Sequence, residues 1–306
     1  MRFAHISDLH ALDLEGVSLW SFFNKRFAGY VNLLRKRRKA HPVQLLDALC
    51  ADLNQQPLDH VVVTGDLSNL SLPSELVRAR RSLDALKLGP REVTVIPGNH
   101  DVYVREAQKR RHFEQVLGPY SEGDEAPAGG ARFPFVRVRG DVAFIACSTA
   151  RPSPPPLADG RLGPAQLAAI EEALAAQRGR FRVLLIHHPV LPQRLDLLRA
   201  LRDRDSLREI LARVGCELVL HGHEHRDLRA ELTGPDGPIP VIGVGSGTYD
   251  DPRPERRARY NIYTVDRDGD RFTLRIDQRV HDLSRDGFIP HPALEPSRFT
   301  LPALAS

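Results

Sequence analysis

Five short apolar segments of this sequence each run directly into histidine, aspartate or asparagine, and this feature constrains the fold most. Apolar, β-branched runs of this length predict buried strands, here over 3–7, 60–64, 93–96, 183–186 and 218–220. The side chains that follow are, in chain order, Asp8 and His10; Asp66; Asn99, His100 and Asp101; His187 and His188; and His221, His223 and His225. Ligands bind at the carboxyl ends of strands in an open α/β sheet, so we expect these side chains to meet at one edge.

Helical patterns separate the strands and predict a layered α/β fold. We expect helices over 43–53, 74–86, 164–177 and 195–214, and a further strand over 142–147. The C-terminal part differs, because segments 239–245, 260–265 and 272–276 predict antiparallel strands, the last two joined through an Asp-Gly turn. We predict one domain over 1–285, with an insert at 14–41 and an irregular tail over 286–306.

Composition excludes several classes of protein. The 306 residues are 42% hydrophobic and 27% charged, which is ordinary globular usage. No run of 18 apolar residues suggests a transmembrane helix, and the first motif begins too early for a signal peptide. The cysteines Cys50, Cys147 and Cys216 are far apart without zinc-ligand spacing. They predict buried thiols in a reducing cytoplasm.

The chemistry of the five clusters predicts a metal centre. Histidine and carboxylate without thiolate suit manganese, iron or zinc. Two such ions roughly 3.5–4 Å apart form a clamp for in-line displacement at phosphorus. Gly65, Gly98 and Gly222 precede three of the candidate ligands and permit sharp turns there. A lone histidine at a strand end is usually structural, but five clusters in sheet order favour the metal centre.

These motifs together resemble the calcineurin-like metallophosphoesterase superfamily, whose pattern is D-x-H, G-D, G-N-H-[DE], H and G-H-x-H. Every element is present in order across residues 8 to 225. The resemblance implies a four-layer αββα sandwich with two facing mixed sheets. It also implies that two divalent metal ions, manganese first with iron or zinc as alternatives, activate a water that hydrolyses a phosphodiester or pyrophosphate bond.

The resemblance also implies roles for individual residues. The first metal would be held by Asp8, His10, Asp66 and His225, and the second by Asp66, Asn99, His187 and His223. His100 would face the phosphate, and Asp101 would orient it. Either His187 or His188 could be the ligand, and we favour His187 because the superfamily's histidine stands two residues before the proline.

Departures from the pattern narrow the choice among the branches of the superfamily. Leu67-Ser68-Asn69 follows Gly65-Asp66, and the fourth residue of the Gly-Asn-His motif is Asp101, which differs from Ser/Thr protein phosphatases. The sequence is most similar to bacterial class III phosphodiesterases. A UDP-2,3-diacylglucosamine pyrophosphatase of the lipid A pathway is the alternative. A non-enzymatic scaffold stabilised by metal is a third hypothesis, against which the complete ligand set argues.

The insert between the first two motifs is the unusual part of this sequence. Residues 18–40 hold seven Lys and Arg and no acidic residue, while the whole chain has a net charge of only +4. On a helix, one face would be apolar and the other cationic, which is typical of a membrane-surface helix. We expect this segment to contact substrate or membrane through Trp20, Phe23, Lys25, Arg26 and Phe27.

Three interpretations of the insert remain open: a solvated helix packed on the body, a lid that reaches a substrate at the inner face of the membrane, and, least favoured, a nucleic-acid contact. The lid would suit a nucleotide-linked or lipid-linked phosphate ester. It would make the protein cytoplasmic with peripheral membrane attachment.

Overall fold

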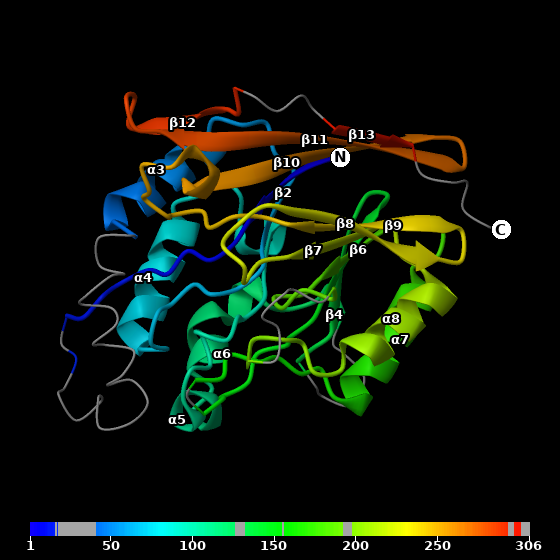
Figure 1. Ribbon diagram of the computed structural model, residues 1–306, viewed down its shortest axis with the longest axis horizontal. Helices are drawn as coiled ribbons and strands as arrows, with labels where there is room; N and C mark the ends of the chain where they lie inside the picture. Colours follow the sequence, from blue (N-terminus) through cyan, green and yellow to red (C-terminus); the bar gives the residue numbers. More distant parts are fainter. Residues whose placement is uncertain are drawn as a thin grey trace.

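Two mixed β-sheets face each other, with helices on their outer sides (Figure 1). The computed structural model describes residues 1–15, 17, 41–125, 132–154, 156–191, 198–292 and 297–300. The first sheet has the strand order β12 (Gly287–Pro290), β11 (Arg271–Asp282), β10 (Arg259–Asp268), β1 (Arg2–Ile6), β2 (His60–Val63) and β3 (Val93–Val95), with β13 (Ser297–Thr300) also paired to β11. The second has the order β4 (Phe135–Arg139), β5 (Val142–Ala146), β6 (Phe181–Leu185), β7 (Leu218–His221), β9 (Gly237–Gly243) and β8 (Leu228–Gly234).

The helices divide between the two outer faces of this pair of sheets. The described helices are α3 (Val43–Leu53), α4 (Pro73–Asp84), α5 (Arg105–Lys109), α6 (His112–Leu117), α7 (Pro164–Ala176) and α8 (Arg204–Val214), with short 3₁₀ turns at Pro90–Glu92, Gly118–Tyr120 and Pro254–Arg256. Figure 1 shows α3 and α4 on one side of the molecule and α7 and α8 on the other. Among the residues described, every helix is too short or too polar to cross a bilayer.

Three apolar layers hold these elements together, because successive side chains of a strand point to opposite faces. On β1, Ile6 packs toward α3 and α4, whereas Phe3 packs into the space between the sheets. On β6, Val183 joins that same central layer, whereas Leu184 packs toward α7 and α8. The layers therefore stack in the order helices, sheet, sheet, helices, and the predicted four-layer αββα sandwich is confirmed.

The C-terminal strands agree with the predicted hairpin but extend further than expected. β10 and β11 pair antiparallel around Gly269, whose φ is +60°. The prediction of an irregular tail from 286 was wrong where the tail is described, because β12 and β13 both pair with β11. β11 continues to Asp282, so its outer edge offers backbone groups that these segments satisfy.

Other predictions have mixed outcomes. The helix over 43–53 is confirmed to the residue, and the three cysteines are buried and unpaired. The helix predicted over 195–214 begins only at Arg204, because the Asp203 carboxylate accepts hydrogen bonds from the Leu162 and Gly163 amides and holds the preceding loop. The predicted contact residues Trp20, Phe23, Lys25, Arg26 and Phe27 lie outside the described residues.

Candidate metal centre

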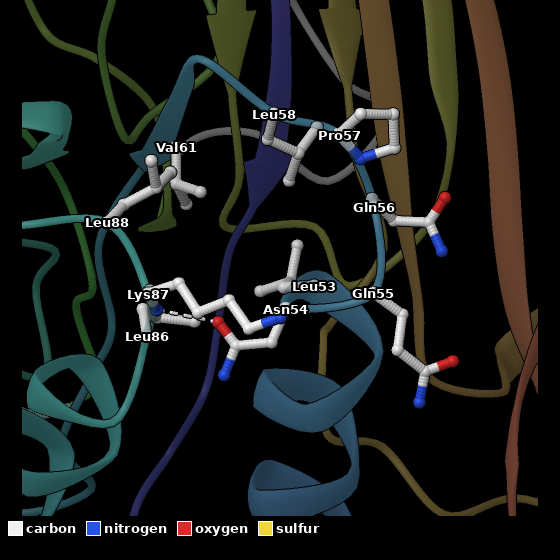
Figure 2. A pocket seen from close by; sticks show the side chains of 10 residues that line it. All are labelled: Leu53, Asn54, Gln55, Gln56, Pro57, Leu58, Val61, Leu86, Lys87 and Leu88. Atoms are coloured by element: carbon white, nitrogen blue, oxygen red, sulfur yellow. Dashed lines mark hydrogen bonds between the residues drawn. The ribbon is translucent and has the colours of Figure 1, made fainter.

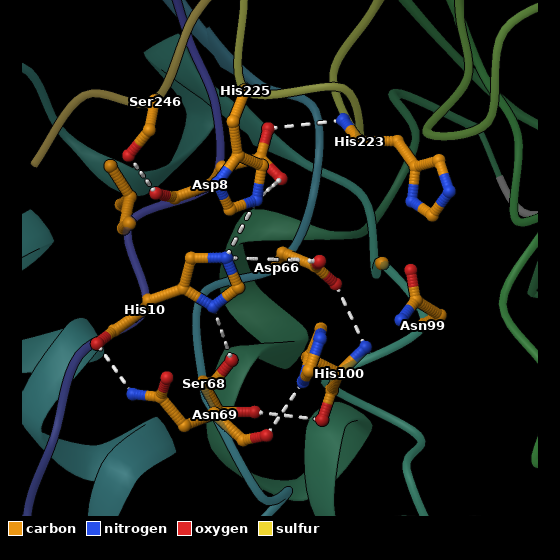
Figure 3. A network of polar contacts seen from close by, with 12 residues as sticks. Asp8, His10, Asp66, Ser68, Asn69, Asn99, His100, His223, His225 and Ser246 are labelled. Carbon is orange, nitrogen blue, oxygen red and sulfur yellow. Dashed lines mark hydrogen bonds and ion pairs between the residues drawn. The ribbon is translucent and has the colours of Figure 1, made fainter. Parts of the chain in front are cut away.

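Side chains that follow β1, β2 and β3 of the first sheet and β6 and β7 of the second meet at one place. Figure 3 shows Asp8, His10, Asp66 and His225 close together there. Two groups of candidate ligands form there, each with its ligand atoms within 4.8 Å of one another: Asp8, His10, Asp66 and His225, and Asp66, His187 and His223. The predicted ligand Asn99 adjoins the second group, with Oδ1 3.3 Å from His187 Nε2. The seven side chains that the sequence singled out as ligands are thus brought together.

Asp66 belongs to both groups, and its two oxygens have different environments. Oδ1 accepts a hydrogen bond of 2.8 Å from the His100 backbone amide, which fixes the carboxylate. Oδ2 lies 3.4 Å from His187 Nε2 and 4.0 Å from His10 Nε2, between one ligand of each group. This oxygen therefore has the position that a bridging ligand requires.

The first group turns ring nitrogens and carboxylate oxygens toward its centre. His10 Nδ1 donates to the Ser68 carbonyl at 3.2 Å, which leaves Nε2 to face His225 Nε2 at 3.0 Å. Asp8 Oδ2 accepts from the His223 amide at 3.0 Å, and Asp8 Oδ1 lies 3.1 Å from His225 Nε2. Second partners that orient an imidazole in this way are typical of metal ligands.

The second group resolves the choice between the two adjacent histidines. His187 Nδ1 donates to the Thr64 carbonyl at 2.7 Å, so Nε2 faces Asn99 Oδ1 and His223 Nδ1, each at 3.3 Å. His188 instead bonds through Nδ1 to Thr149 Oγ1 at 2.7 Å and through Nε2 to the Ala158 carbonyl at 3.2 Å. The geometry therefore favours His187 as the ligand.

The backbone at these positions is strained. Five of the seven candidate ligands have positive φ values although none is glycine: Asp8, His10, Asp66, His223 and His225, with φ between 45° and 73°. Such residues cost about 1–3 kcal/mol each and persist where the surrounding structure enforces them, commonly at functional sites.

Burial and neighbouring charges shift the pKa values of four candidate ligands. Burial raises the pKa of Asp8 and of Asp66, but neighbouring histidines outweigh it, so the pKa of each carboxyl is below its usual value. Burial lowers the pKa of His223 well below its usual value, and the nearby His188 adds to this. Burial also opposes charge on His187, but Asp66 overrides it and raises the His187 pKa to about 9. His187 would therefore release a proton on binding a metal.

The donor set fits a pair of divalent cations. Asp8 and Asp66 are both buried carboxylates, and burying a charged oxygen is costly unless a cation lies next to it. Two carboxylates, an amide oxygen and four imidazoles suit manganese, iron or zinc rather than magnesium or calcium. The described side chains could therefore bind divalent metal ions.

His100 lies beside the two groups, and its support differs from the prediction. Its Nδ1 donates to the Asn69 carbonyl at 2.7 Å, and its ring stacks on Tyr103 with centroids 5.4 Å apart. The Asp101 carboxylate, expected to orient His100, instead accepts hydrogen bonds from the amides of Leu67, Ser68 and Gly98. Asp101 therefore fixes the loops that carry Asp66 and Asn99, because its side chain turns back toward their backbone.

Two residues at the site were not among the predicted site residues. His41 is buried, with its ring centroid 4.8 Å from that of His10, and it forms a third candidate group with His10 and His225. Thr248 Oγ1 donates to the Leu9 carbonyl, so it accepts from His41 Nδ1 at 2.9 Å and leaves the lone pair on Nε2. Arg199 donates from Nη2 to the His223 carbonyl at 2.9 Å. No local pattern marks either residue.

A cavity of about 370 Å³ opens above the centre. It is lined by Asp66, Asn99, His100, Ala158, Arg199, His223, Glu224 and His225. Another cavity, of about 330 Å³, lies at the opposite end of β2 between the carboxyl ends of α3 and α4 (Figure 2). Its lining is mainly leucine and amide side chains, with no histidine or carboxylate, so this cavity offers no candidate metal ligand.

Comparison with known proteins agrees with this geometry. The family profile for calcineurin-like phosphoesterases matches residues 1–227, and the chain belongs to this family. It is 31% identical over 210 residues to the cAMP/cGMP dual specificity phosphodiesterase MT0825 of Mycobacterium tuberculosis (strain CDC 1551 / Oshkosh). That match covers 67% of this chain but only 59% of the relative's length.

A solved structure shares the fold. The purple acid phosphatase PPD1 from yellow lupin (Lupinus luteus) seeds superimposes with a TM-score of 0.63 at 14% identity, covering 99% of this chain and 53% of that one. At this identity the likeness shows the fold alone.

Proposed function

We propose that this protein is a metal-dependent phosphoesterase that hydrolyses a phosphodiester or a phosphoanhydride. One observation carries the proposal: Asp66 Oδ2 is shared by two donor groups directly beneath a cavity of about 370 Å³. A shared carboxylate between two divalent ions is the arrangement that supports in-line displacement at phosphorus. The phosphodiesterase MT0825, of the same family, supports the choice of a diester over a monoester.

The candidate ligands would hold two ions, the first through Asp8, His10, Asp66 and His225 and the second through Asp66, Asn99, His187 and His223. When bound, the ions would supply an activated water and neutralise charge on the phosphoryl group. We favour manganese, with iron or zinc as alternatives, because the set is mixed imidazole and carboxylate.

His100 and Arg199 would act on the substrate from the walls of the cavity. The hydrogen bond from Nδ1 to the Asn69 carbonyl orients the His100 ring, which would share a proton with the leaving oxygen. Arg199 is exposed and bound mainly through the His223 carbonyl, so its remaining N–H groups can donate to a phosphoryl oxygen.

Hydrolysis of bis(p-nitrophenyl) phosphate tests the proposal. We expect turnover with added Mn²⁺, loss of turnover in excess chelator, and recovery when Mn²⁺ is restored, because both ions are needed in the transition state. The absorbance of the released nitrophenolate measures the rate of turnover by the full chain. Absence of turnover with manganese, iron and zinc alike would reject the enzyme and favour a non-enzymatic scaffold.

A membrane-bound substrate is a second candidate, and the described flanks of segment 18–40 favour it. On one side, Leu14, Val17 and Tyr103 all pack against Leu70 and Leu72, and Tyr103 stacks on His100. On the other side, His41 contacts the first ligand group. The segment therefore leaves and rejoins the fold next to the cavity, and its cationic and aromatic residues suit an anionic lipid surface.

Sedimentation with anionic vesicles tests this second candidate. We expect retention at low salt that falls as salt rises, and at least a tenfold weaker partition for Trp20→Glu/Phe23→Glu, about the loss from two inserted aromatic side chains. Leu283→Glu, at an exposed site in the turn between β11 and β12, is the control and should partition normally. Vesicle binding by the wild-type chain would justify testing UDP-2,3-diacylglucosamine as a substrate. Failure of the wild-type chain to sediment would exclude binding to the membrane.

A further inference from the structure

A third cavity, a hollow of about 540 Å³, is lined almost entirely by cationic and amide side chains. Its walls are Arg105, Gln108 and Lys109 of α5 and, from the loop after β5, Arg151 and Pro152. The lining contains no acidic residue. Three long cations from two different segments thus surround one concave space, which is the composition of an anion site rather than of a solvated surface.

The charge of this hollow is largely uncompensated. Within the part of the chain that the structure describes, neither Arg105 nor Lys109 has a carboxylate within 4.0 Å. Arg151 lies 3.5 Å from Asp159 Oδ2, but Asp159 also binds Arg202, so a single anion serves two guanidinium groups. On the same helix, Glu106 pairs with Arg110 instead, at 3.1 Å.

Both walls of the hollow continue from walls of the catalytic cavity. Helix α5 begins two residues after Tyr103, which stacks on His100. On the other wall, Asp159 holds Arg151 and directly follows Ala158, which lines the catalytic cavity with His100. A substrate whose scissile phosphate lies over Asp66 therefore has a cationic space next to it.

From this arrangement we infer that Arg105, Lys109 and Arg151 bind a second phosphate group of the substrate. The substrate class would be a phosphoester that carries another phosphate, such as a phosphorylated nucleotide ester or a nucleoside diphosphate ester, rather than a cyclic nucleotide with a single phosphate. This inference rests on the proposed function, and it names the substrate class for the same site. Arginine forks suit phosphate because they donate two parallel hydrogen bonds.

A pair of matched esters tests the inference: thymidine 5′-(p-nitrophenyl phosphate) and its 3′-phosphorylated analogue. A diphosphate analogue, with the nitrophenyl group on the terminal phosphate, places the second phosphate at a different position relative to the scissile phosphate. We expect kcat/KM in manganese-loaded wild type to be at least about tenfold higher for one phosphorylated analogue than for the parent, the effect of one charge-assisted hydrogen bond. In Arg105→Gln/Arg151→Gln the gain should disappear, while hydrolysis of the parent ester is unchanged.

Arg110→Gln is the matched control, because Arg110 lies on the turn that ends α5 but pairs with Glu106 outside the hollow. It should keep the full gain. If neither analogue exceeds the parent ester, or if the gain survives in the double variant, the second phosphate site is rejected. If no ester is hydrolysed by any metal-loaded form, the proposed function itself has failed. Binding of single-stranded DNA that depends on both arginines, without any gain from the second phosphate, would instead identify a nucleic-acid contact and overturn the inference.

Discussion

Asp66→Asn is expected to lower kcat/KM for bis(p-nitrophenyl) phosphate by about a thousandfold or more. Asparagine retains an oxygen that can accept from the His100 amide, as Asp66 Oδ1 does at 2.8 Å. It removes the negative charge between His10 and His187, which is the charge that both ions would share. Losing such a ligand removes several kcal/mol of transition-state stabilisation, and about 4 kcal/mol corresponds to a thousandfold in rate.

Metal content separates loss of the bridge from loss of the fold. After gel filtration of manganese-loaded protein, wild type should retain about two ions per chain, as the two-ion clamp requires, and Asp66→Asn fewer than one. Wild type should also gain thermal stability from added Mn²⁺, whereas the variant should not. Asp47→Asn, which loses an exposed ion pair with Arg78, is the control and should behave as wild type. A variant that keeps two ions and a tenth of the activity would contradict the shared position of Asp66.

Strands and ligands could be predicted because their signals are local. β2 and β3 begin at the residues that the apolar runs indicated, and a candidate ligand, Asp66 or Asn99, lies in the loop that follows each strand. Parallel neighbours bring their carboxyl ends to one edge, so the convergence of Asp8, Asp66 and Asn99 followed from strand order alone. The pairing of the second sheet with the first came from the family resemblance rather than from any local pattern.

Elements whose sequence contradicts their environment could not be predicted. β4 contains Arg137, which is buried because its guanidinium donates to the carbonyls of Pro90, Arg91 and Val93. A charged residue at a buried position therefore interrupts the alternation of apolar and polar residues that would predict this strand. β8 is mostly exposed and lacks a β-branched run, so its pairing with β9 has no local signal either.

The contacts of individual side chains at the site also lie beyond sequence reasoning. Asp101 turns toward three backbone amides because the loops after β2 and β3 fold against each other. His41 joins His10 although 31 positions separate them. Both facts depend on how distant loops pack, and periodicity carries no information about that.

Gly65→Ala is expected to destabilise the protein by about 3 kcal/mol or more and to abolish manganese binding. Gly65 has φ +99°, which alone costs a residue with a side chain about 1–3 kcal/mol. An added Cβ would also lie 2.6 Å from the Gly98 amide nitrogen and 2.7 Å from His187 Nδ1. Relief of such overlap in a packed interior costs a further 1–3 kcal/mol or so. It would move His187 away from the Thr64 carbonyl, which fixes the direction of its ring.

Gly179→Ala isolates the contribution of the backbone angle. Gly179 has φ +94°, almost the same as Gly65, but a Cβ there would meet nothing within 4 Å. Urea unfolding should therefore show Gly65→Ala less stable than Gly179→Ala by at least about 1 kcal/mol, the overlap contribution alone. Only Gly65→Ala should lose manganese. Equal stabilities, with manganese binding intact in both variants, would mean that the turn before Asp66 can accommodate a Cβ atom. The close approach of Gly65 to Gly98 and His187 would then not be what holds the two ligand groups together.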